Sequence, residues 1–207
     1  MHMNEDASLE TAPSGEEDSA RDLRLMLRVK GGDTEAFREL VEAHQNRIVS
    51  TVARMIEDQT EAEDIAQQVF LRIWKSAPRW EPSAKFTTWA FTIMKNLVFN
   101  EQRRRSRRRT LPLETKDDDD TYQHQHADES VKSPDRIVLE AEHEAAIERA
   151  IQELPESQRL VLVLRRYQDV SYEEMMDIFK LTLPAVKSLL FRARSQLREK
   201  LREYLEG

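Results

Sequence analysis

Long stretches of this chain consist of Leu, Ala, Glu, Arg and Gln, and glycine occurs only 4 times in 207 residues. These five residue types have high helix propensity, whereas most β architectures need glycine-rich turns. Near the C-terminus, apolar residues recur three to four positions apart, at Val186, Leu190, Ala193, Leu197 and Leu201. That spacing is typical of one buried face of a helix. The sequence therefore predicts an all-α fold.

Two acidic, polar segments divide the chain. Residues 1–20 carry no apolar period and predict a disordered tail, with helical patterning beginning near Asp22. Residues 110–135 are poor in apolar side chains and predict a flexible acidic linker. We therefore expect two small helical domains, a bundle of four helices over residues 21–109 and a C-terminal domain over residues 136–207.

Capping residues predict where several helices begin. Asp33 follows two glycines and is expected to cap a helix through its carboxylate. Thr60 with Glu63 fits a capping box, and Ser171 with Glu174 fits a second one. In such a box the hydroxyl and the carboxylate satisfy backbone N–H groups that a helix start leaves unpaired.

The formal net charge is −7, but the charges are segregated. Six arginines fall within residues 103–109, at the end of a long helix expected to start at Thr87 or Thr88, whereas residues 117–120 are four aspartates. Local charge governs binding to a polyanion, so the arginine block favours contact with phosphates. The alternative is a solubilising helix end, where cations are favourable.

Several functions are excluded or disfavoured by composition. Without cysteine, the chain cannot form disulfides, thiolate zinc sites or cysteine nucleophiles. His124 and His126 lack the further ligands of a closed zinc site. No apolar run reaches the roughly 18 residues of a membrane span, and the acidic N-terminus is unlike a secretory signal. No Gly-rich phosphate loop or catalytic triad is recognisable. We expect a cytoplasmic protein that is not an enzyme, with no metal, cofactor, small-molecule substrate or membrane insertion.

The C-terminal domain has the ingredients of a helix-turn-helix. Ser171 is expected to open a short helix that ends near Phe179, and a tight turn at residues 180–182 leads into a longer basic helix ending near Tyr204. In a helix-turn-helix the second helix enters the major groove of DNA. From the pattern alone, an antiparallel bundle with a solvated basic face is the alternative.

This segment resembles the C-terminal domain of sigma factors of the extracytoplasmic function group, through Ser-Tyr-Glu-Glu-Met at 171–175, Leu-Pro-Ala-Val-Lys-Ser at 183–188 and Phe-Arg-Ala-Arg at 191–194. The resemblance implies that the domain reads the minus-thirty-five promoter element. The DNA-facing candidates that it implies are Pro184, Ala185, Lys187, Ser188 and Arg192. The chain departs from the family at Lys180, where glycine is common, and at Leu189, where arginine is usual.

Residues 63–74, Glu-Asp-Ile-Ala-Gln-Gln-Val-Phe-Leu-Arg-Ile-Trp, resemble the helix by which these sigma factors grip core RNA polymerase. The resemblance implies a polymerase-binding surface made by Asp64, Gln67, Gln68 and Arg72. A capped surface helix without a partner is the alternative.

The stretches Lys-Phe-Thr-Thr-Trp at 85–89 and Ile-Met-Lys-Asn-Leu at 93–97 continue the resemblance. In the family this part captures the minus-ten element as a single strand with a base flipped into a pocket, and aromatic stacking stabilises such a complex. The candidates that it implies are Trp80, Phe86, Thr87, Lys95, Asn96, Asn100, Arg103 and Arg104. Trp89 is expected to belong to the core.

Taken together, the two resemblances imply a sigma factor whose partners are core RNA polymerase and promoter DNA, and they allow an anti-sigma factor as a third. A helix-turn-helix regulator that binds duplex DNA without polymerase is the main alternative, and a scaffold protein that binds RNA or an acidic partner is another. For the acidic linker, occupation of a positively charged polymerase channel and a solvated spacer both stay open.

Overall fold

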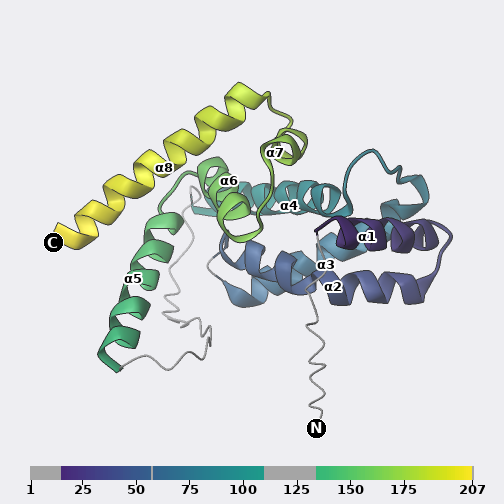
Figure 1. The fold of residues 1–207 in the computed structure, drawn as a ribbon, viewed down its shortest axis with the longest axis horizontal. Helices are drawn as coiled ribbons and strands as arrows, with labels where there is room; N and C mark the ends of the chain where they lie inside the picture. The colour runs from purple at the N-terminus through teal and green to yellow at the C-terminus, as the bar shows by residue number, and fades with distance from the viewer. Residues whose placement is uncertain (1–14, 57, 110–133, 207) are drawn as a thin grey trace, which may run out of the picture.

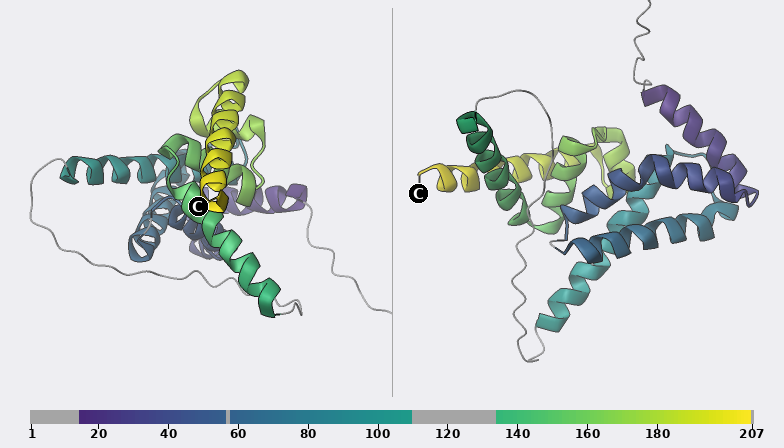
Figure 2. Two further views of the ribbon diagram at one scale, coloured as in Figure 1. Left: turned by 90° about the vertical axis from the view of Figure 1, so that its left-hand side faces the viewer. Right: turned by 90° about the horizontal axis from the view of Figure 1, so that it is seen from below.

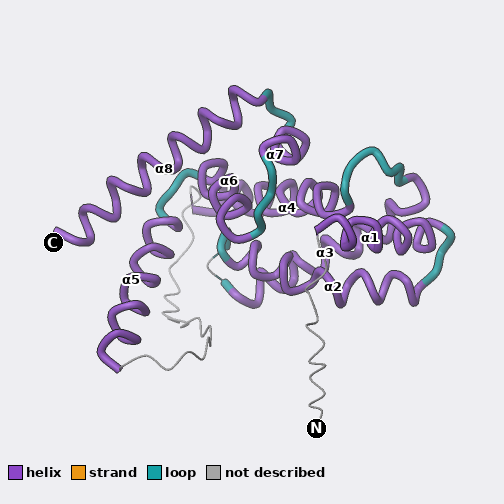
Figure 3. The backbone as a smooth tube through the Cα atoms, viewed as in Figure 1, coloured by secondary structure: helices purple, strands orange, loops and turns teal. Residues whose placement is uncertain are grey.

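The computed structural model describes residues 15–56, 58–109 and 134–206, and every regular element within these ranges is helical (Figure 3). This confirms the predicted fold class. In chain order the elements are α1 (Gly15–Lys30), α2 (Thr34–Ala53), α3 (Gln59–Ser76), the short 3-10 helix η1 (Ala77–Arg79), α4 (Phe86–Arg109), α5 (Pro134–Gln152), α6 (Glu156–Tyr167), α7 (Tyr172–Phe179) and α8 (Leu183–Glu206).

Helices α1 to α4 pack together with η1 and are called the first bundle (Figure 1). Asp33 caps α2 as expected, since its carboxylate accepts hydrogen bonds from the backbone N–H groups of Glu35 and Ala36 at 2.9 and 3.0 Å. The four helices turn their apolar faces inward. The largest completely buried side chains of this core are Met26, Leu40, Ile48, Met55, Ile73, Phe91 and Met94.

Three helix starts differ from the sequence expectation. Helix α1 begins at Gly15, so residues 15–20, which were predicted to be disordered, are helical; acidic residues in a first turn are favoured by the helix dipole. Helix α3 is capped by Asp58, whose carboxylate accepts from the N–H of Glu61 at 2.9 Å, so Thr60 lies inside the helix and the predicted capping box is wrong. Helix α5 begins at Pro134, because proline is well suited to a first helical position.

Helices α5 to α8 form the second bundle, in which α8 packs on α5, α6 and α7. The capping box of Ser171 and Glu174 is present on α7, as predicted. Lys180 ends α7 in the left-handed region, with φ 54° and ψ 47°. Glycine adopts this conformation without strain, whereas a side chain costs roughly 1–2 kcal/mol there. The backbone of Lys180 is therefore strained in the turn between the two helices of the helix-turn-helix.

The two bundles are packed against one another. Helix α7 contacts α4 at a steep angle, and α6 contacts α2 (Figures 1 and 2). One continuous cluster of buried apolar side chains runs through both bundles. The arrangement is therefore closed, with the first helix of the helix-turn-helix set against the longest helix of the first bundle.

Two further expectations concern membranes and metals. None of the helices in the described ranges is long and apolar enough to cross a bilayer. Within the same ranges, no three His, Asp or Glu side chains gather as ligands for a metal ion. His124, His126 and the aspartates at 117–120 lie outside the residues that the structure describes.

Candidate polymerase and nucleic-acid interfaces

The outer face of α3 carries the predicted polymerase contacts. Ile65, Val69 and Ile73 point into the core, and the opposite face presents the exposed side chains of Asp64, Gln67, Gln68 and Arg72. This face can offer carboxylate and amide groups to a partner. The structure adds Leu71, which the sequence analysis missed and whose side chain is 55% exposed among these polar residues. An apolar side chain in this position can anchor a protein contact.

Trp80 and Phe86 do not lie where base stacking would need them. They are only 6% and 4% exposed, so neither ring is accessible to a base in this structure, and their minus-ten role stays a prediction. Trp80 packs against Trp89 with ring centroids 6.2 Å apart, and Phe86 packs against His44 at 4.9 Å. This aromatic cluster fixes the loop before α4 onto the bundle. Trp89 is half-buried and contributes to the same packing, in agreement with its assignment to the core.

His44 also contacts a buried carboxylate. Its Nε2 lies 2.9 Å from Oδ1 of Asp22 on α1, and both side chains are less than a tenth exposed. Buried polar groups of this kind need a partner, and each supplies it to the other. The pair joins α1 to α2 directly beneath Phe86, so it supports the start of α4. Sequence reasoning missed the pair, because its members are 22 residues apart.

Along α4, the predicted contacts fall into two groups. Asn96, Asn100 and Arg103 are exposed on the helix surface, whereas Thr87 is half-buried. Lys95 is covered by the second bundle: its Nζ donates a hydrogen bond of 2.6 Å to the backbone carbonyl of Ile178. Burial lowers the pKa of the Lys95 ammonium below its ordinary value, and the nearby positive charge of Lys180 lowers it further.

The arginine block is partly neutralised by acids of its own bundle. Arg104 donates to both carboxylate oxygens of Glu101, at 2.7 and 2.8 Å. Arg105 forms an ion pair with Glu61 on α3. Arg103 donates to the side chain of Asn100 at 2.8 Å. Less of the positive charge is therefore available for phosphates than six arginines in seven positions suggest.

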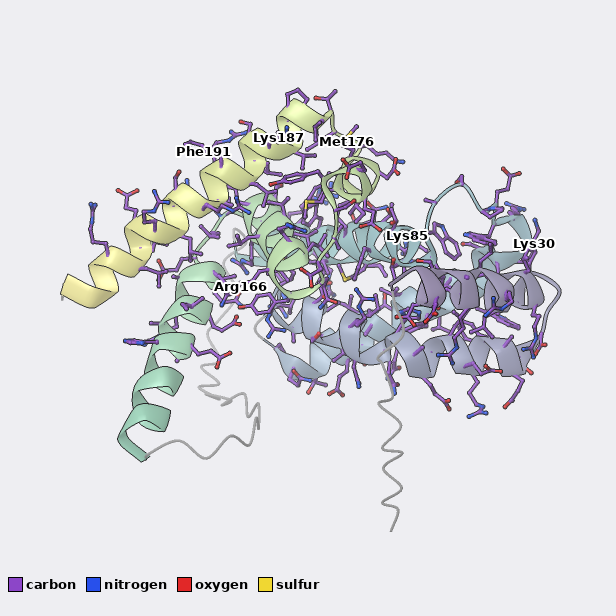
Figure 4. The ribbon with its side chains drawn as sticks, viewed as in Figure 1. Lys30, Lys85, Arg166, Met176, Lys187 and Phe191 are labelled. Atoms are coloured by element: carbon purple, nitrogen blue, oxygen red, sulfur yellow. The ribbon has the colours of Figure 1, made fainter. Side chains whose placement is uncertain are left out.

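The predicted duplex-binding surface lies on the N-terminal half of α8. Pro184, Lys187, Ser188 and Arg192 are exposed, and Ala185 is half-buried. In Figure 4, Lys187 lies on the side of α8 that faces away from the first bundle. The buried side of the helix carries Val186, Leu190 and Ala193, as the apolar spacing predicts. These positions suit a helix that enters a major groove.

Two residues of α8 have roles that the sequence analysis did not assign. Phe191 is 71% exposed, one turn from Lys187 and beside it in Figure 4. A ring in this place can contact the methyl group of thymine. Its position outside the apolar stripe was the available signal. Leu189, where relatives commonly have arginine, packs partly buried against the core. The lost polar contact is thus replaced by packing.

A helical bundle with an exposed polar helix, joined to a helix-turn-helix, defines a two-part DNA-binding protein. Family models agree with this description: sigma-70 region 2 matches residues 40–108, and sigma-70 region 4 matches residues 144–197. The chain is 32% identical to the RNA polymerase sigma-H factor of Pseudomonas aeruginosa over 185 residues, which is 89% of this chain and 96% of that protein. It is 29% identical to the ECF RNA polymerase sigma factor SigW of Bacillus subtilis over 176 residues, 85% of this chain and 94% of that protein.

Solved structures show the same fold. A complex of CnrH with the cytosolic domain of CnrY aligns with a TM-score of 0.65 at 22% identity, over 88% of this chain and 98% of that chain. The sigma factor RpoE of Bartonella quintana, bound to the anti-sigma factor NepR, aligns with a TM-score of 0.62 at 20% identity, over 80% of this chain and 96% of that chain. The chain belongs to the sigma-70 family, in the extracytoplasmic function group.

Proposed function

We propose that this chain binds core RNA polymerase through α3 and directs it to promoters, reading duplex DNA with α8 and capturing single-stranded DNA with α4. The observation that carries the proposal is that both family regions occur in order on one chain, each with an exposed polar helix face. A regulator acting without polymerase would leave the outer face of α3 without a role. The chain supplies recognition and positioning, and the polymerase supplies the chemistry.

For polymerase docking, we assign Asp64, Gln67, Gln68 and Arg72. Their backbone is held by a capped helix whose opposite face is buried, so the four side chains are presented from a rigid element. Polar groups around one apolar side chain, here Leu71, are a usual composition for a protein interface.

For the minus-thirty-five element, we assign the exposed residues of α8. Lys187 and Arg192 can reach phosphates or the O6 and N7 acceptors of guanine, and Ser188 can bond to either kind of base edge. Phe191 adds an apolar contact. Pro184 and Ala185 stand at the start of the helix, where a major-groove helix approaches base edges.

For the minus-ten element, we assign Asn96, Asn100 and Arg103 as exposed contacts, with Thr87, Lys95 and Arg104 completing the surface. Trp80 and Phe86 support this surface from below rather than stacking on a base, because both rings are buried. A flipped base is then held by polar side chains and by the loop that the aromatic cluster fixes.

The test is run-off transcription with bacterial core polymerase on a library of promoter fragments. Initiation that depends on this chain and shares one promoter motif is the expected result. The variant Asp64→Ala with Gln67→Ala should lose core binding by at least about tenfold, since central interface contacts each contribute roughly 1–2 kcal/mol or more. The matched control replaces Glu42 and Gln45, which are exposed on α2, with alanine. Equal binding by variant and control would contradict the docking assignment.

A further inference from the structure

The loop before α4, residues 80–85, is fixed at its first residue by the end of α1. Nζ of Lys30 donates a hydrogen bond of 2.9 Å to the backbone carbonyl of Trp80. Lys30 is the last residue of α1, and Figure 4 shows it at the end of this helix that lies next to η1. A hydrogen bond from an ammonium group is stronger than one between neutral groups. Helix α1 therefore sets the direction in which the loop leaves η1.

A buried polar pair fixes the other end of the loop, where α4 begins. Nε2 of His44 lies 2.9 Å from Oδ1 of Asp22, and the His44 ring packs against Phe86 with centroids 4.9 Å apart. Asp22 belongs to α1, about two turns before Lys30. A carboxylate only accepts hydrogen bonds, so Asp22 fixes the proton on Nε2. The same hydrogen bond holds the plane of the ring that Phe86 contacts.

Aromatic packing connects the two ends of the loop. The Phe86 ring lies 6.3 Å from Trp89 in an edge-on arrangement, and the Trp89 ring lies 6.2 Å from Trp80, measured between centroids. The contacts that begin and end on α1 are called the α1 contact chain, and its members are Asp22, His44, Phe86, Trp89, Trp80 and Lys30. The side chains of residues 81–85 are all exposed. A loop with few buried contacts takes its position from its ends, which here are held by this chain.

The carboxylate of Asp22 is out of place if α1 serves stability alone. Asp22 occupies the same buried face of α1 as Leu25, Met26 and Val29, at helical spacing. Apolar side chains usually stabilise a buried position at least as well as a buried polar pair does. A directional hydrogen bond to His44 is what a carboxylate adds there, and it orients a ring in contact with the loop.

A cavity lies beside this pair, so the start of α4 has room to shift when the pair is lost. The cavity has a volume of about 440 Å³, and its lining includes Asp22, His44 and Thr87. Glu174 of α7 lines the same cavity, and its Oε1 lies 3.0 Å from Nζ of Lys85, the last residue of the loop. This ion pair reaches the loop from the second bundle. Its contribution must be separated from that of α1 in any test.

We propose that Asp22, His44 and Lys30 are positioning residues for single-strand capture, which hold the loop before α4 in the shape that receives the flipped base. The proposal rests on the proposed function and adds α1 to it. Helix α1 precedes residues 40–108, which match sigma-70 region 2, and carries none of the contacts assigned above. Contacts to phosphates carry no sequence information, so loss of the α1 contact chain should weaken discrimination between bases more than overall affinity.

The first measurement is hydrogen exchange in the full chain without polymerase or DNA. The backbone N–H of Trp80 donates to the carbonyl of Ala77, and that of Trp89 donates to the carbonyl of Lys85, so these two amides report the ends of the loop. Asp22→Ala should speed their exchange by about tenfold, because local opening becomes easier. Asp22→Asn should restore the wild-type rates, since its amide oxygen can still accept from Nε2.

Three further variants make this measurement specific. Asp18→Ala, an exposed aspartate one turn earlier on α1, is the matched control and should exchange as the wild type does. Glu174→Gln weakens the contact of the second bundle with Lys85, and it should leave the exchange of the Trp80 amide unchanged. Lys30→Ala changes an exposed residue and tests the other end of the loop, so the proposal stays testable if Asp22→Ala fails to fold. Its matched control is Lys75→Ala, an exposed lysine on α3.

The second measurement is base discrimination by the complex with core polymerase. The probe is the non-template minus-ten strand of a promoter found by run-off, with each base replaced in turn. The largest single-base discrimination should fall about tenfold in Asp22→Ala and Lys30→Ala, because a mobile loop no longer shapes the base pocket. It should be normal in Asp22→Asn and both controls. Affinity for core polymerase should be the same in all chains.

Unchanged exchange in Asp22→Ala and Lys30→Ala, with helical content unchanged by circular dichroism, would overturn the anchoring. Faster exchange with unchanged base discrimination would overturn the positioning role. Equal effects of Asp22→Ala and Asp22→Asn would overturn the assignment to the hydrogen bond with His44. Hydrogen exchange needs no promoter or polymerase, so its failure is distinct from a failure of the chain to direct initiation.

Discussion

The two proposed DNA surfaces, on α4 and on α8, are built from the same kind of helix but differ in what surrounds them. On α8 the polar side chains face away from the rest of the molecule, and its apolar stripe is covered by the second bundle. On α4 the helix is packed on both sides, by the first bundle and by α7. The proposed reading face of α8 is thus open, whereas on α4 one proposed contact, Lys95, is partly covered by α7.

The difference matches the order of events that the two targets impose. Duplex DNA exists before the polymerase acts, so a surface that reads it can stay exposed. A single strand exists only after melting, and Lys95, one cation of the surface proposed to capture it, is partly covered in this structure. Covering Lys95 while leaving Lys187 open is consistent with such a division of labour.

The largest effect should come from the open surface. Lys187→Ala with Arg192→Ala should lower the affinity of the free chain for promoter duplex by about a hundredfold, because each contact to a base or phosphate contributes roughly 1–3 kcal/mol. Fluorescence anisotropy with a labelled minus-thirty-five duplex measures it. Lys95→Ala, on the covered surface, is the control and should leave duplex affinity unchanged. An equal loss in both would remove the distinction between the surfaces.

The covered surface should matter only in the polymerase complex. Lys95→Ala should reduce open-complex formation by about tenfold, since one polar contact to the captured strand is lost, while binding to core polymerase stays the same. Permanganate footprinting of melted thymines measures it. Lys75→Ala, an exposed lysine at the end of α3, is the matched control. No difference between the two variants would contradict the assignment of Lys95.

A smaller effect should appear at the turn between α7 and α8. Lys180→Gly should raise the free energy of unfolding by about 0.5–1 kcal/mol, because relief of the left-handed strain exceeds the extra backbone entropy of glycine. Urea denaturation followed by circular dichroism measures it. Glu199→Gly, an exposed change within α8, should instead destabilise by about 1 kcal/mol. A loss of stability in Lys180→Gly would show that this turn does not favour glycine.

The smallest effect should be a loosening of closure in acid. Burial raises the pKa of Glu174, but the Ser171 backbone and Lys85 together outweigh it, so the pKa lies below its ordinary value of 4.5. The ionised Glu174 carboxylate therefore stabilises the packing of the two bundles fully above pH 4.5. This stabilisation is lost as the pH falls through the lowered pKa of Glu174. Asp18, Asp22 and Asp169 line the same cavity, so Glu174→Gln is the reference.

Energy transfer between dyes on Ser76→Cys and Ser157→Cys, one exposed position in each bundle, is recorded against pH to test this loosening of the packing. The wild-type chain should lose transfer in the acid range more steeply than Glu174→Gln, which lacks this carboxylate. Identical curves for the two chains would show that the ion pair with Lys85 contributes nothing to closure.

What the sequence determined by itself was local. Helix periodicity, the caps at Asp33 and Ser171, and the turn before α8 all depend on residues within a few positions of each other, and each is where it was expected. The same short-range patterns carried the resemblance to the sigma-70 family. At the start of α3 the local pattern predicted a capping box at Thr60, and this was wrong, since Asp58 caps the helix.

The tertiary structure alone decided which predicted contacts are accessible. Trp80 and Phe86 look like stacking residues in the sequence but are buried, because Trp80 packs on Trp89 of α4 and Phe86, at the start of α4, packs on His44 of α2. Lys95 meets a carbonyl 83 residues away, on the other bundle. Neither arrangement can be predicted from the neighbouring residues in the sequence, because burial and long-range pairing follow from how whole helices pack. That packing also determines which of the two surfaces is open and which is covered.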